Sequence, residues 1–281
     1  MTPPPPLPRR ARPIPAMILA AGRGERMRPL SDHTPKPLLP VQGKPLMQWP
    51  LEALARGGFS RVVVNTAWLG PQIAATFGSH FRPEPPPNMR EQLPNSEQIE
   101  LHYSDEGQDF GGALETAGGI ARALPLLGEL FWVLAGDVFA PGFSFSQEAV
   151  ERFTASGKLA HLWLVPNPVH KPVGDFGIDS AGLALAQAPT MYTYATIGLY
   201  RRTLFAPPWC DIPAGNPRGV QARLAPLLRA AMQPGLVSAE LYCGAWTDVG
   251  TPERLQALNQ APLTGPAAPV RGRLDPPHDP R

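Results

Sequence analysis

Residues 18–36 read ILAAGRGERMRPLSDHTPK, and this stretch decides how the rest of the sequence is interpreted. A short apolar strand at 17–20 runs directly into a loop of small residues at 21–24, and two cations follow, at Arg26 and Lys36. Glycines in such a loop let backbone N–H groups approach a ligand closely, and two separated cations can neutralise a polyphosphate. The pattern predicts a site for a nucleoside triphosphate. The expected nucleotide-binding residues of this segment are Leu19, Ala20, Ala21, Gly22 and Gly24.

The loop differs from two common phosphate-binding loops. No Gly-Lys-Ser or Gly-Lys-Thr closes it, which excludes a Walker loop, and Met27 stands where a dinucleotide-binding fingerprint has its third glycine. Gly22 and Gly24 alone are equally consistent with an ordinary turn after a strand. The functional interpretation therefore depends on the longer string and on motifs elsewhere in the chain.

Apolar runs alternate with helical patterns through the first half of the chain. Further strands are expected at 61–65, 99–103 and 131–135, helices at 45–57, 71–77 and 112–124, and a surface loop at 82–98. With right-handed crossovers, this alternating order predicts a doubly wound parallel sheet covered on both faces, with ligands bound outside the carboxyl ends of its strands. The second half is richer in strands, expected at 159–165, 176–179, 183–186, 191–200, 237–242 and 246–249, with helices near 220–232 and at 252–258.

Proline is concentrated at the two ends of the chain, residues 1–15 and 261–281, which hold many of its 38 prolines. Such ends cannot bury enough apolar surface to offset chain entropy, so we expect two disordered tails around one folded domain at 16–260. Arginine outnumbers acidic residues in both tails, so the body is slightly acidic although the formal net charge of the chain is +2. Neither nucleic acid nor a membrane surface is an expected partner. The oligomeric state stays open.

The two cysteines, Cys210 and Cys243, show no metal-ligand spacing and no adjacent base signature. Neither a disulfide framework nor a thiol nucleophile is expected. No apolar run reaches about 18 residues, the length of a membrane span, and the proline-rich start lacks the apolar segment of a signal peptide. These features predict a cytoplasmic location.

Two aspartates lie in short segments that suggest a metal site. Asp137 follows an apolar run in the tetrapeptide AGDV, and Asp248 lies in WTDVGTP. Each can be a turn or helix-cap residue, or a ligand of Mg²⁺, which takes one or two carboxylates together with phosphate oxygens and water. Together with the glycine loop and its two cations, the carboxylates complete a set suited to charge stabilisation in phosphoryl transfer, which favours the metal interpretation.

The string at 18–36 resembles the signature of the nucleotidyltransferases that make nucleotide sugars, L-A-[AG]-G-x-G-x-R-[ML]-x-P-L-T followed by P-K-[PA]-[ML], with Ser31 in place of the usual threonine. The two aspartate segments also resemble the metal-binding segments of this family. The resemblance implies a Rossmann-like mixed sheet of the nucleotide-diphospho-sugar transferase type, in a single α/β domain with a β-rich, sugar-binding second half and no left-handed β-helix. It further implies Mg²⁺ as cofactor, and the residues it assigns are Asp137 and Asp248 as metal ligands and Arg26 and Lys36 as catalytic groups.

A third segment, ETAGGI at 115–120, resembles the ETGGGI of bacterial N-acetylmuramate α-1-phosphate uridylyltransferases, and this resemblance extends over residues 16–259. Its glycines are also consistent with nothing more than close packing of a helix. By similarity, the residues expected beside the nucleobase are Glu115, Thr116, Ala117 and Gly118.

Two positions depart from that family's pattern. Ala117 stands where the family has glycine, which adds a methyl group where a base could approach, and Thr196 replaces a glycine on a strand that the resemblance places against the sugar. Asp175, in a D-F pair, is a second candidate contact for the sugar, or else a solvent-facing strand end. His170 or Lys171 could meet the sugar phosphate, although isolated loop charges are mostly solvated.

The reaction implied by the resemblance condenses UTP with a sugar 1-phosphate, specifically N-acetylmuramic acid α-1-phosphate, to a UDP-sugar and pyrophosphate in peptidoglycan recycling. Glucose-1-phosphate thymidylyltransferase and mannose-1-phosphate guanylyltransferase share the first motif and stay as alternatives. A molybdenum-cofactor guanylyltransferase fits the TPKP and WTDVGT segments less well. The alternative from another class is a non-catalytic nucleotide-binding regulator of the same fold, which the substitutions Ala117 and Thr196 raise and the retained charged residues oppose.

Overall fold

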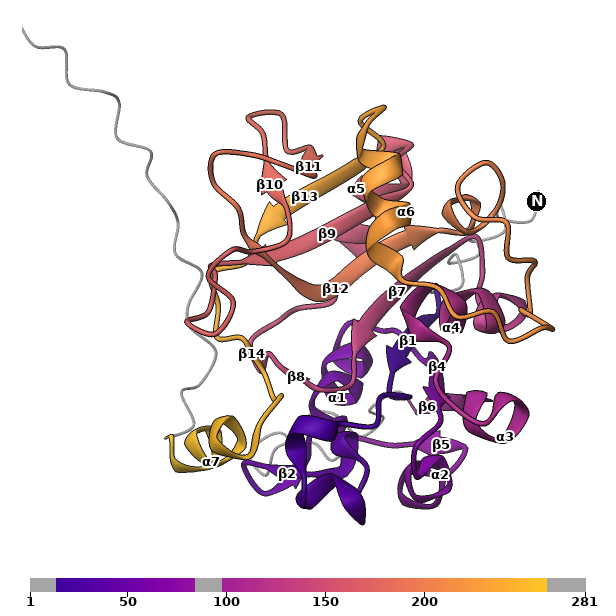
Figure 1. Ribbon diagram of the computed structural model, residues 1–281, viewed down its shortest axis with the longest axis vertical. Helices are drawn as coiled ribbons and strands as arrows, with labels where there is room; N and C mark the ends of the chain where they lie inside the picture. Colours follow the sequence, from indigo (N-terminus) through magenta and orange to yellow (C-terminus); the bar gives the residue numbers. More distant parts are fainter. Residues whose placement is uncertain (1–13, 84–97, 262–281) are drawn as a thin grey trace, which may run out of the picture.

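The computed structural model describes residues 14–83 and 98–261, which form an eight-stranded mixed sheet with helices on both faces (Figure 1). Along the sheet the strands are β13 (Val237–Leu241), β9 (Ala160–Val165), β12 (Thr193–Arg201), β7 (Leu130–Ala135), β1 (Ala16–Leu19), β4 (Arg61–Thr66), β6 (Ile99–Asp105) and β5 (His80–Phe81). The α-helices are α1 (Gln48–Arg56), α2 (Gly70–Phe77), α3 (Glu106–Phe110), α4 (Glu115–Ala123), α5 (Gln147–Ser156), α6 (Leu224–Met232) and α7 (Pro252–Gln260). Three small pairs join β2 (Pro40–Val41) to β3 (Lys44–Pro45), β8 (Val138–Phe139) to β14 (Thr247–Asp248), and β10 (Gly177–Ile178) to β11 (Ala184–Leu185). The 3-10 helices are η1 (Glu25–Met27), η2 (Leu30–Asp32), η3 (Lys36–Leu38), η5 (Leu124–Leu126) and η6 (Arg202–Phe205).

Four parallel strands form the doubly wound part of the sheet, as the sequence predicts. β1 pairs in parallel with β4 on one side and with β7 on the other, and β6 continues the sheet beyond β4. The strand order therefore reverses at β1, because β4 and β6 follow it on one side and β7 lies on the other. The crevice at such a reversal, outside the carboxyl ends of the strands, is where ligands of this type of sheet bind.

The second half of the chain makes the sheet mixed. β12 runs antiparallel to both β7 and β9, and β13 then pairs with β9 in parallel. The register of β12 against β9 shifts between Tyr194 and Ile197, which marks a bulge in β12. The single α/β domain with a β-rich second half is thus confirmed for the described residues.

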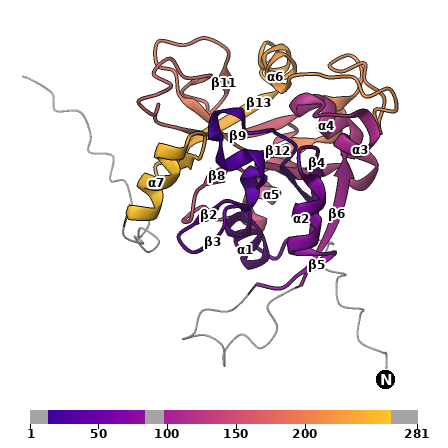
Figure 2. The ribbon, with the colours of Figure 1, turned by 60° about the horizontal axis from the view of Figure 1, so that its bottom comes forward.

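Side chains alternate between two apolar layers, one on each face of the sheet. From β1, Ile18 packs in the layer with α1, α2 and α5, whereas its neighbour Met17 packs in the layer with α4 and α6 (Figure 2). Because both faces are buried, the parallel strands read as continuous apolar runs. A third, smaller cluster joins η1, the β2–β3 pair and α7, and its buried members include Met27, Val249 and Leu255.

Some predicted elements differ from those observed. The predicted helix at 112–124 begins only at Glu115, as α4, and the short helix α3 before it was not predicted. The helix near 220–232 begins only at Leu224. Helix α5 was not predicted, although Ser146 caps its first turn through Ala149 N and Gly157 ends it at a φ of 64°. Most of the predicted surface loop at 82–98, and most of each predicted tail, lie outside the described residues. Among the described helices, none has the length and apolar character to cross a membrane.

Candidate functional site

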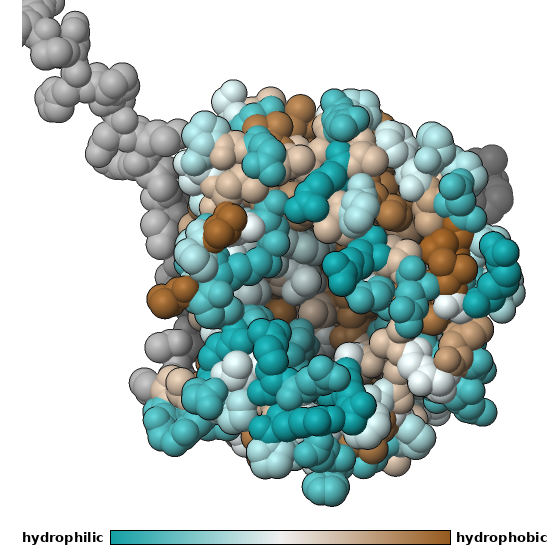
Figure 3. All heavy atoms as spheres, viewed as in Figure 1, coloured by the Kyte–Doolittle hydropathy of each residue, from teal (hydrophilic) through white to brown (hydrophobic). Residues whose placement is uncertain are grey.

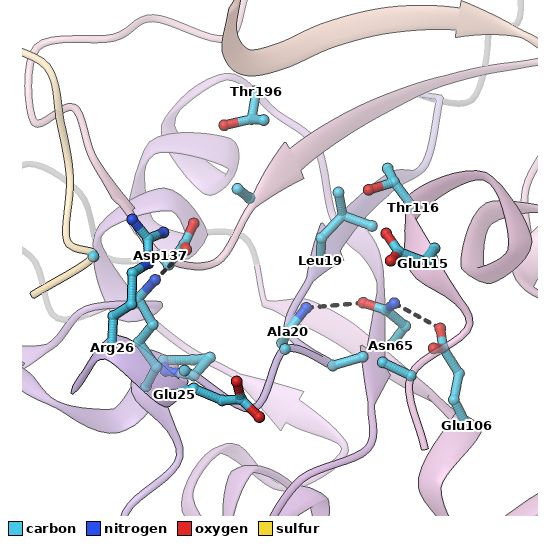
Figure 4. A pocket seen from close by; sticks show the side chains of 18 of the residues that line it. Leu19, Ala20, Glu25, Arg26, Asn65, Glu106, Glu115, Thr116, Asp137 and Thr196 are labelled. Carbon is cyan, nitrogen blue, oxygen red and sulfur yellow. Dashed lines mark hydrogen bonds and ion pairs between the residues drawn. The ribbon is translucent and has the colours of Figure 1, made fainter. Parts of the chain in front are cut away.

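A cavity of about 730 Å³ opens at the carboxyl ends of the four parallel strands. Each strand contributes a lining residue from its end or just beyond it: Leu19 from β1, Asn65 from β4, Glu106 after β6 and Ala135 from β7. The hollow lies near the middle of the face in Figure 3, and Figure 4 shows its lining side chains. Its position is the crevice at which the strand order reverses.

Most of the residues predicted for the site line this cavity, namely Leu19, Ala20, Ala21, Gly22, Gly24, Arg26, Lys36, Glu115, Thr116, Asp137 and Thr196. The predicted residues that are not among its lining are Ala117, Gly118, Asp175 and Asp248.

The loop at 20–24 presents bare backbone to the cavity. A Cβ built on Gly22 meets no atom within 4 Å, so this stretch of backbone is open to a ligand. Gly24 has a φ of 67°, in the left-handed region that favours glycine. Ser31 Oγ donates a 2.8 Å hydrogen bond to Gly24 O, and Trp68 Nε1 in turn donates to Ser31 O at 2.9 Å. These bonds fix the loop from behind.

The two predicted cations, Arg26 and Lys36, lie on one side of the cavity. Asp137, which follows β7, lies on the same side. Lys36 is buried, with 8% of its surface exposed, and its Nζ forms an ion pair with Asp137 Oδ2. Arg26 is exposed and lies beside this pair (Figure 4). A buried lysine is retained when it is paired or hydrogen-bonded, and here the partner is itself a predicted metal ligand.

The two aspartates predicted to bind metal lie on neighbouring segments, but their carboxylates have different partners. Val249 N donates to Asp137 O at 2.8 Å, and β14 pairs with β8, so the two chain segments run side by side. Asp248 Oδ1, however, accepts a 2.6 Å hydrogen bond from Arg254 Nη1 and lies 2.9 Å from His170 Nε2. Only Asp137 lines the cavity.

These two carboxylates are the predicted metal ligands, and only one of them lines the cavity. No cluster of three or more His, Cys, Asp and Glu residues suited to a metal occurs in the described ranges. Two carboxylates on adjacent segments are nevertheless hard oxygen donors of the kind that Mg²⁺ takes together with substrate phosphate and water. The donor chemistry therefore fits Mg²⁺, provided that Asp248 exchanges Arg254 for the ion.

The opposite wall is the start of α4 and the loop that covers it. Glu115 and Thr116 line the cavity, and Glu115 has a φ of 60°, which is uncommon for a residue other than glycine. Gln221 reaches the same wall from the segment before α6. Ala222 O, in that segment, accepts a 2.8 Å hydrogen bond from Ala117 N, which ties the segment to the helix.

The structure corrects the prediction for Ala117 and Gly118. Ala117 is fully buried in the apolar layer beneath α4, so its methyl group faces the core and not the cavity. A Cβ on Gly118 would collide with Val220 O, and one on Gly119 would lie 2.5 Å from Glu106 Oε1. Close packing of the helix, the alternative interpretation, accounts for both glycines.

The sugar-side predictions have mixed outcomes. Thr196 lines the cavity from the bulge in β12. Its φ of 54° lies in the left-handed region that favours glycine, the residue that the family pattern has at this position. Asp175 does not line it, because its Oδ2 accepts a 2.9 Å hydrogen bond from Tyr194 N and pairs with Lys171 Nζ. His170 is engaged with Asp248, so both candidate cations for the sugar phosphate have carboxylate partners.

Two lining residues that the sequence interpretation missed are buried polar groups, Asn65 and Glu106. Burial raises the pKa of Glu106, against the lowering effect of hydrogen bonds from Leu114 N and Asn65. Asn65 lies at the end of β4 and Glu106 directly follows β6. Ligands of such sheets bind at the carboxyl ends of the parallel strands, so the position of each residue at a strand end was the signal that could have predicted both.

Comparisons with known proteins agree with this geometry. Residues 15–264 match the family model described as nucleotidyl transferase. The chain is 43% identical over 249 residues to the N-acetylmuramate alpha-1-phosphate uridylyltransferase of Neisseria meningitidis serogroup B, covering 86% of this chain and 95% of that protein. It is 29% identical to the UTP–glucose-1-phosphate uridylyltransferase of Synechocystis sp., covering 86% of this chain and 62% of that protein.

A solved structure has the same fold. The putative glucose-1-phosphate thymidylyltransferase from Bacillus anthracis superposes with a TM-score of 0.67 at 21% identity, over 87% of this chain and 93% of that one. Because the family model spans nearly all of the described residues, the chain belongs to the nucleotidyl transferase family.

Proposed function

We propose that this chain transfers the uridylyl group of UTP to a sugar 1-phosphate, giving a UDP-sugar and pyrophosphate. The observation that carries the proposal is that the open backbone at Gly22, the buried Lys36 and Asp137 meet in one cavity where the strand order reverses. The choice of UTP rests on the similarity to the uridylyltransferase of Neisseria meningitidis.

The transfer needs no nucleophile from the protein. A phosphate oxygen of the sugar 1-phosphate attacks the α-phosphorus of UTP, and the bond from that phosphorus to the bridging oxygen of pyrophosphate breaks on the opposite side. The amides at Gly22 and Gly24, with Arg26, hold the leaving β- and γ-phosphates. Lys36 stabilises the charge that develops on the reacting phosphates, a role for which its fixed position beside the cavity suits it.

The residues that would hold Mg²⁺ are Asp137 and Asp248. When bound, the ion supplies positive charge to the phosphate oxygens. Arg254 pairs with Asp248 in the structure and His170 lies beside the same carboxylate, so a bound ion would take the place of these groups.

We further propose N-acetylmuramic acid α-1-phosphate as the sugar substrate, by similarity to the same relative, which would place the activity in peptidoglycan recycling. The competing substrate pairs within the family are dTTP with glucose 1-phosphate and GTP with mannose 1-phosphate. The competing class is a regulator that binds nucleotide without turnover.

The test is release of pyrophosphate from UTP, dTTP, GTP and ATP, each with a panel of sugar 1-phosphates that includes N-acetylmuramic acid α-1-phosphate. We expect kcat/KM for UTP to exceed that for GTP by at least ~10²-fold, the scale at which a site that hydrogen-bonds its substrate rejects a wrong one. Equal use of GTP contradicts uridylyl transfer. Tight binding of UTP without pyrophosphate release from any sugar phosphate supports the regulator.

A further inference from the structure

Glu106 is the most deeply buried charged residue at the cavity, with 0% of its surface exposed. Both of its carboxylate oxygens accept hydrogen bonds: Oε1 from Asn65 Nδ2 at 2.6 Å and Oε2 from Leu114 N at 2.7 Å. None of the ion pairs between described residues includes Glu106. Burying a carboxylate without a cation in contact costs folding free energy, which indicates that Glu106 serves a function at this position.

The first oxygen fixes the orientation of the Asn65 amide. Asn65 is 3% exposed, and its Oδ1 accepts a 2.8 Å hydrogen bond from Ala20 N. The N–H of Ala20 is a donor, so the amide oxygen of Asn65 faces Ala20 while its NH₂ group donates to Glu106, which holds the amide in this orientation. Ala20 is the first residue after β1, where the glycine loop begins (Figure 4).

The second oxygen fixes the opposite wall of the cavity. Leu114 directly precedes α4, so its N–H positions the turn from which Glu115 and Thr116 face the cavity. The helix also leaves space for this arrangement, because a Cβ on Gly119 would lie 2.5 Å from Glu106 Oε1 and 2.9 Å from Asn65 Nδ2. One carboxylate thus joins the two walls that would hold a nucleotide.

We propose that Glu106 is a positioning residue, which acts through Asn65 and Leu114 to hold the glycine loop and the start of α4 at the separation that UTP requires. The inference rests on the proposed function for the identity of the nucleotide. It assigns to Glu106 no contact with the reacting atoms.

The test exchanges the two side-chain types. Glu106→Gln keeps the shape but replaces one acceptor oxygen by a donor, which then faces a donor on Asn65 or Leu114. Asn65→Asp puts a second carboxylate against Glu106. The double variant Asn65→Asp with Glu106→Gln restores complementarity, since the carboxylate introduced at position 65 accepts from Ala20 N and from the amide introduced at position 106. The oxygen of that amide in turn accepts from Leu114 N.

We expect each single variant to weaken UTP binding in calorimetry by at least ~10-fold, as when a buried donor or acceptor loses its partner. The double variant should return to within ~3-fold of the unsubstituted protein, because the two sites are coupled. At saturating UTP, kcat of the single variants should fall much less than KM for UTP rises.

A core truncation at the far end of the sheet, Phe205→Leu, serves as the control for lost stability alone. It should lower Tm without changing the Kd for UTP. Single variants that lower Tm but bind UTP normally would overturn the inference, and so would a double variant that binds no better than either single one. If the unsubstituted chain binds another nucleotide and not UTP, the proposed function fails, and the same comparison made with that nucleotide still decides the role of Glu106.

Discussion

Thr196 and Glu115 have left-handed backbone conformations, with φ of 54° and 60°, and both line the cavity. A residue with a Cβ loses roughly 1–2 kcal/mol in this conformation, and a β-branched residue such as threonine is especially unusual there. Strain of this kind persists where the surrounding structure imposes it, and it concentrates at binding sites. Both residues therefore bear on function more than on folding.

Replacing Thr196 by glycine should relieve the strain and remove the contact to the sugar that the sequence predicts for this residue. We expect Thr196→Gly to raise Tm by up to ~2–4 °C, since a net gain of ~1 kcal/mol has that effect in a domain of this size. KM for the sugar 1-phosphate should rise by at least ~3-fold, as expected for one lost contact. The control is Leu69→Gly, at a φ of 53° outside the cavity lining, which should leave both KM values unchanged. An unchanged KM for the sugar phosphate in Thr196→Gly would remove Thr196 from the site.

Ala117 leads to a different prediction from the one that the sequence suggests. A methyl group against the base would favour a pyrimidine, but the methyl of Ala117 lies in the core. We expect Ala117→Gly to leave the ratio of kcat/KM for UTP and GTP unchanged. It should lower the free energy of unfolding by ~1–2 kcal/mol, from glycine in a helix together with one lost buried methyl group. A narrower preference for UTP, measured by pyrophosphate release, would show that Ala117 contacts the base after all.

The sequence predicted the residues of the site that lie close together in the chain. Leu19 to Lys36 form one continuous motif, so local spacing alone brings the glycines and cations together. The hydrogen bonds of Asn65 and Glu106 depend on the order of β1, β4 and β6 in the sheet, which no local pattern specifies. Asp175 shows the reverse failure, because a polar residue at a strand end can serve the neighbouring strand instead of a ligand.

At the scale of elements, the pairing of the parallel strands was predictable, whereas β12 was predicted as a strand at 191–200 without its direction. Strands buried on both faces produce continuous apolar runs, and the helices between them produce the parallel pairing. The direction of β12 depends instead on the path of the long connection from β9, which contains the β10–β11 pair. Helix α5 did carry sequence signals, since Ser146 precedes it, Gly157 follows it, and Ala149, Val150 and Phe153 form its buried face.

The pairing of β8 with β14 brings Asp137 and Asp248 to neighbouring positions, and the proposed metal site depends on it. We expect Asp137→Asn and Asp248→Asn each to lower kcat by at least ~10²-fold, the scale of losing one electrostatic contact to a transition state. Both should also weaken Mg²⁺ binding measured by calorimetry in the presence of UTP. Glu148→Gln, on the exposed side of α5, is the matched control and should change neither quantity. Full activity in EDTA would contradict the metal assignment.

At the scale of the whole molecule, the site depends on a segment far from it in sequence. Helix α7 closes the small apolar cluster beneath η1 and the β2–β3 pair, where Leu255 packs with Met27 and Val41. Gln42 strengthens this contact, because its N donates to Asn259 Oδ1 at 2.7 Å and its Nε2 donates to Ala261 O at 2.8 Å. The end of the described chain thus supports the segment that carries Arg26 and Lys36.

Two truncated chains distinguish the contribution of α7 from that of the proline-rich ends. The packing contacts of the described residues begin at Ile14, and the hydrogen bonds of Gln42 extend as far as Ala261, directly after α7. A chain of residues 14–262 should therefore keep its Tm and its kcat/KM. A chain of residues 14–250 lacks α7, and we expect its Tm to fall by at least ~5 °C, since the lost burial of a leucine alone is worth roughly 1.5–3 kcal/mol. Its Kd for UTP, measured by calorimetry below the lowered Tm, should rise as well, because Met27 and η1 lose the side chains that hold them beneath the glycine loop. A fall in Tm of the same size for 14–262 would mean that one of the ends packs on the domain, and an unchanged Kd for 14–250 would mean that the loop keeps its position without α7.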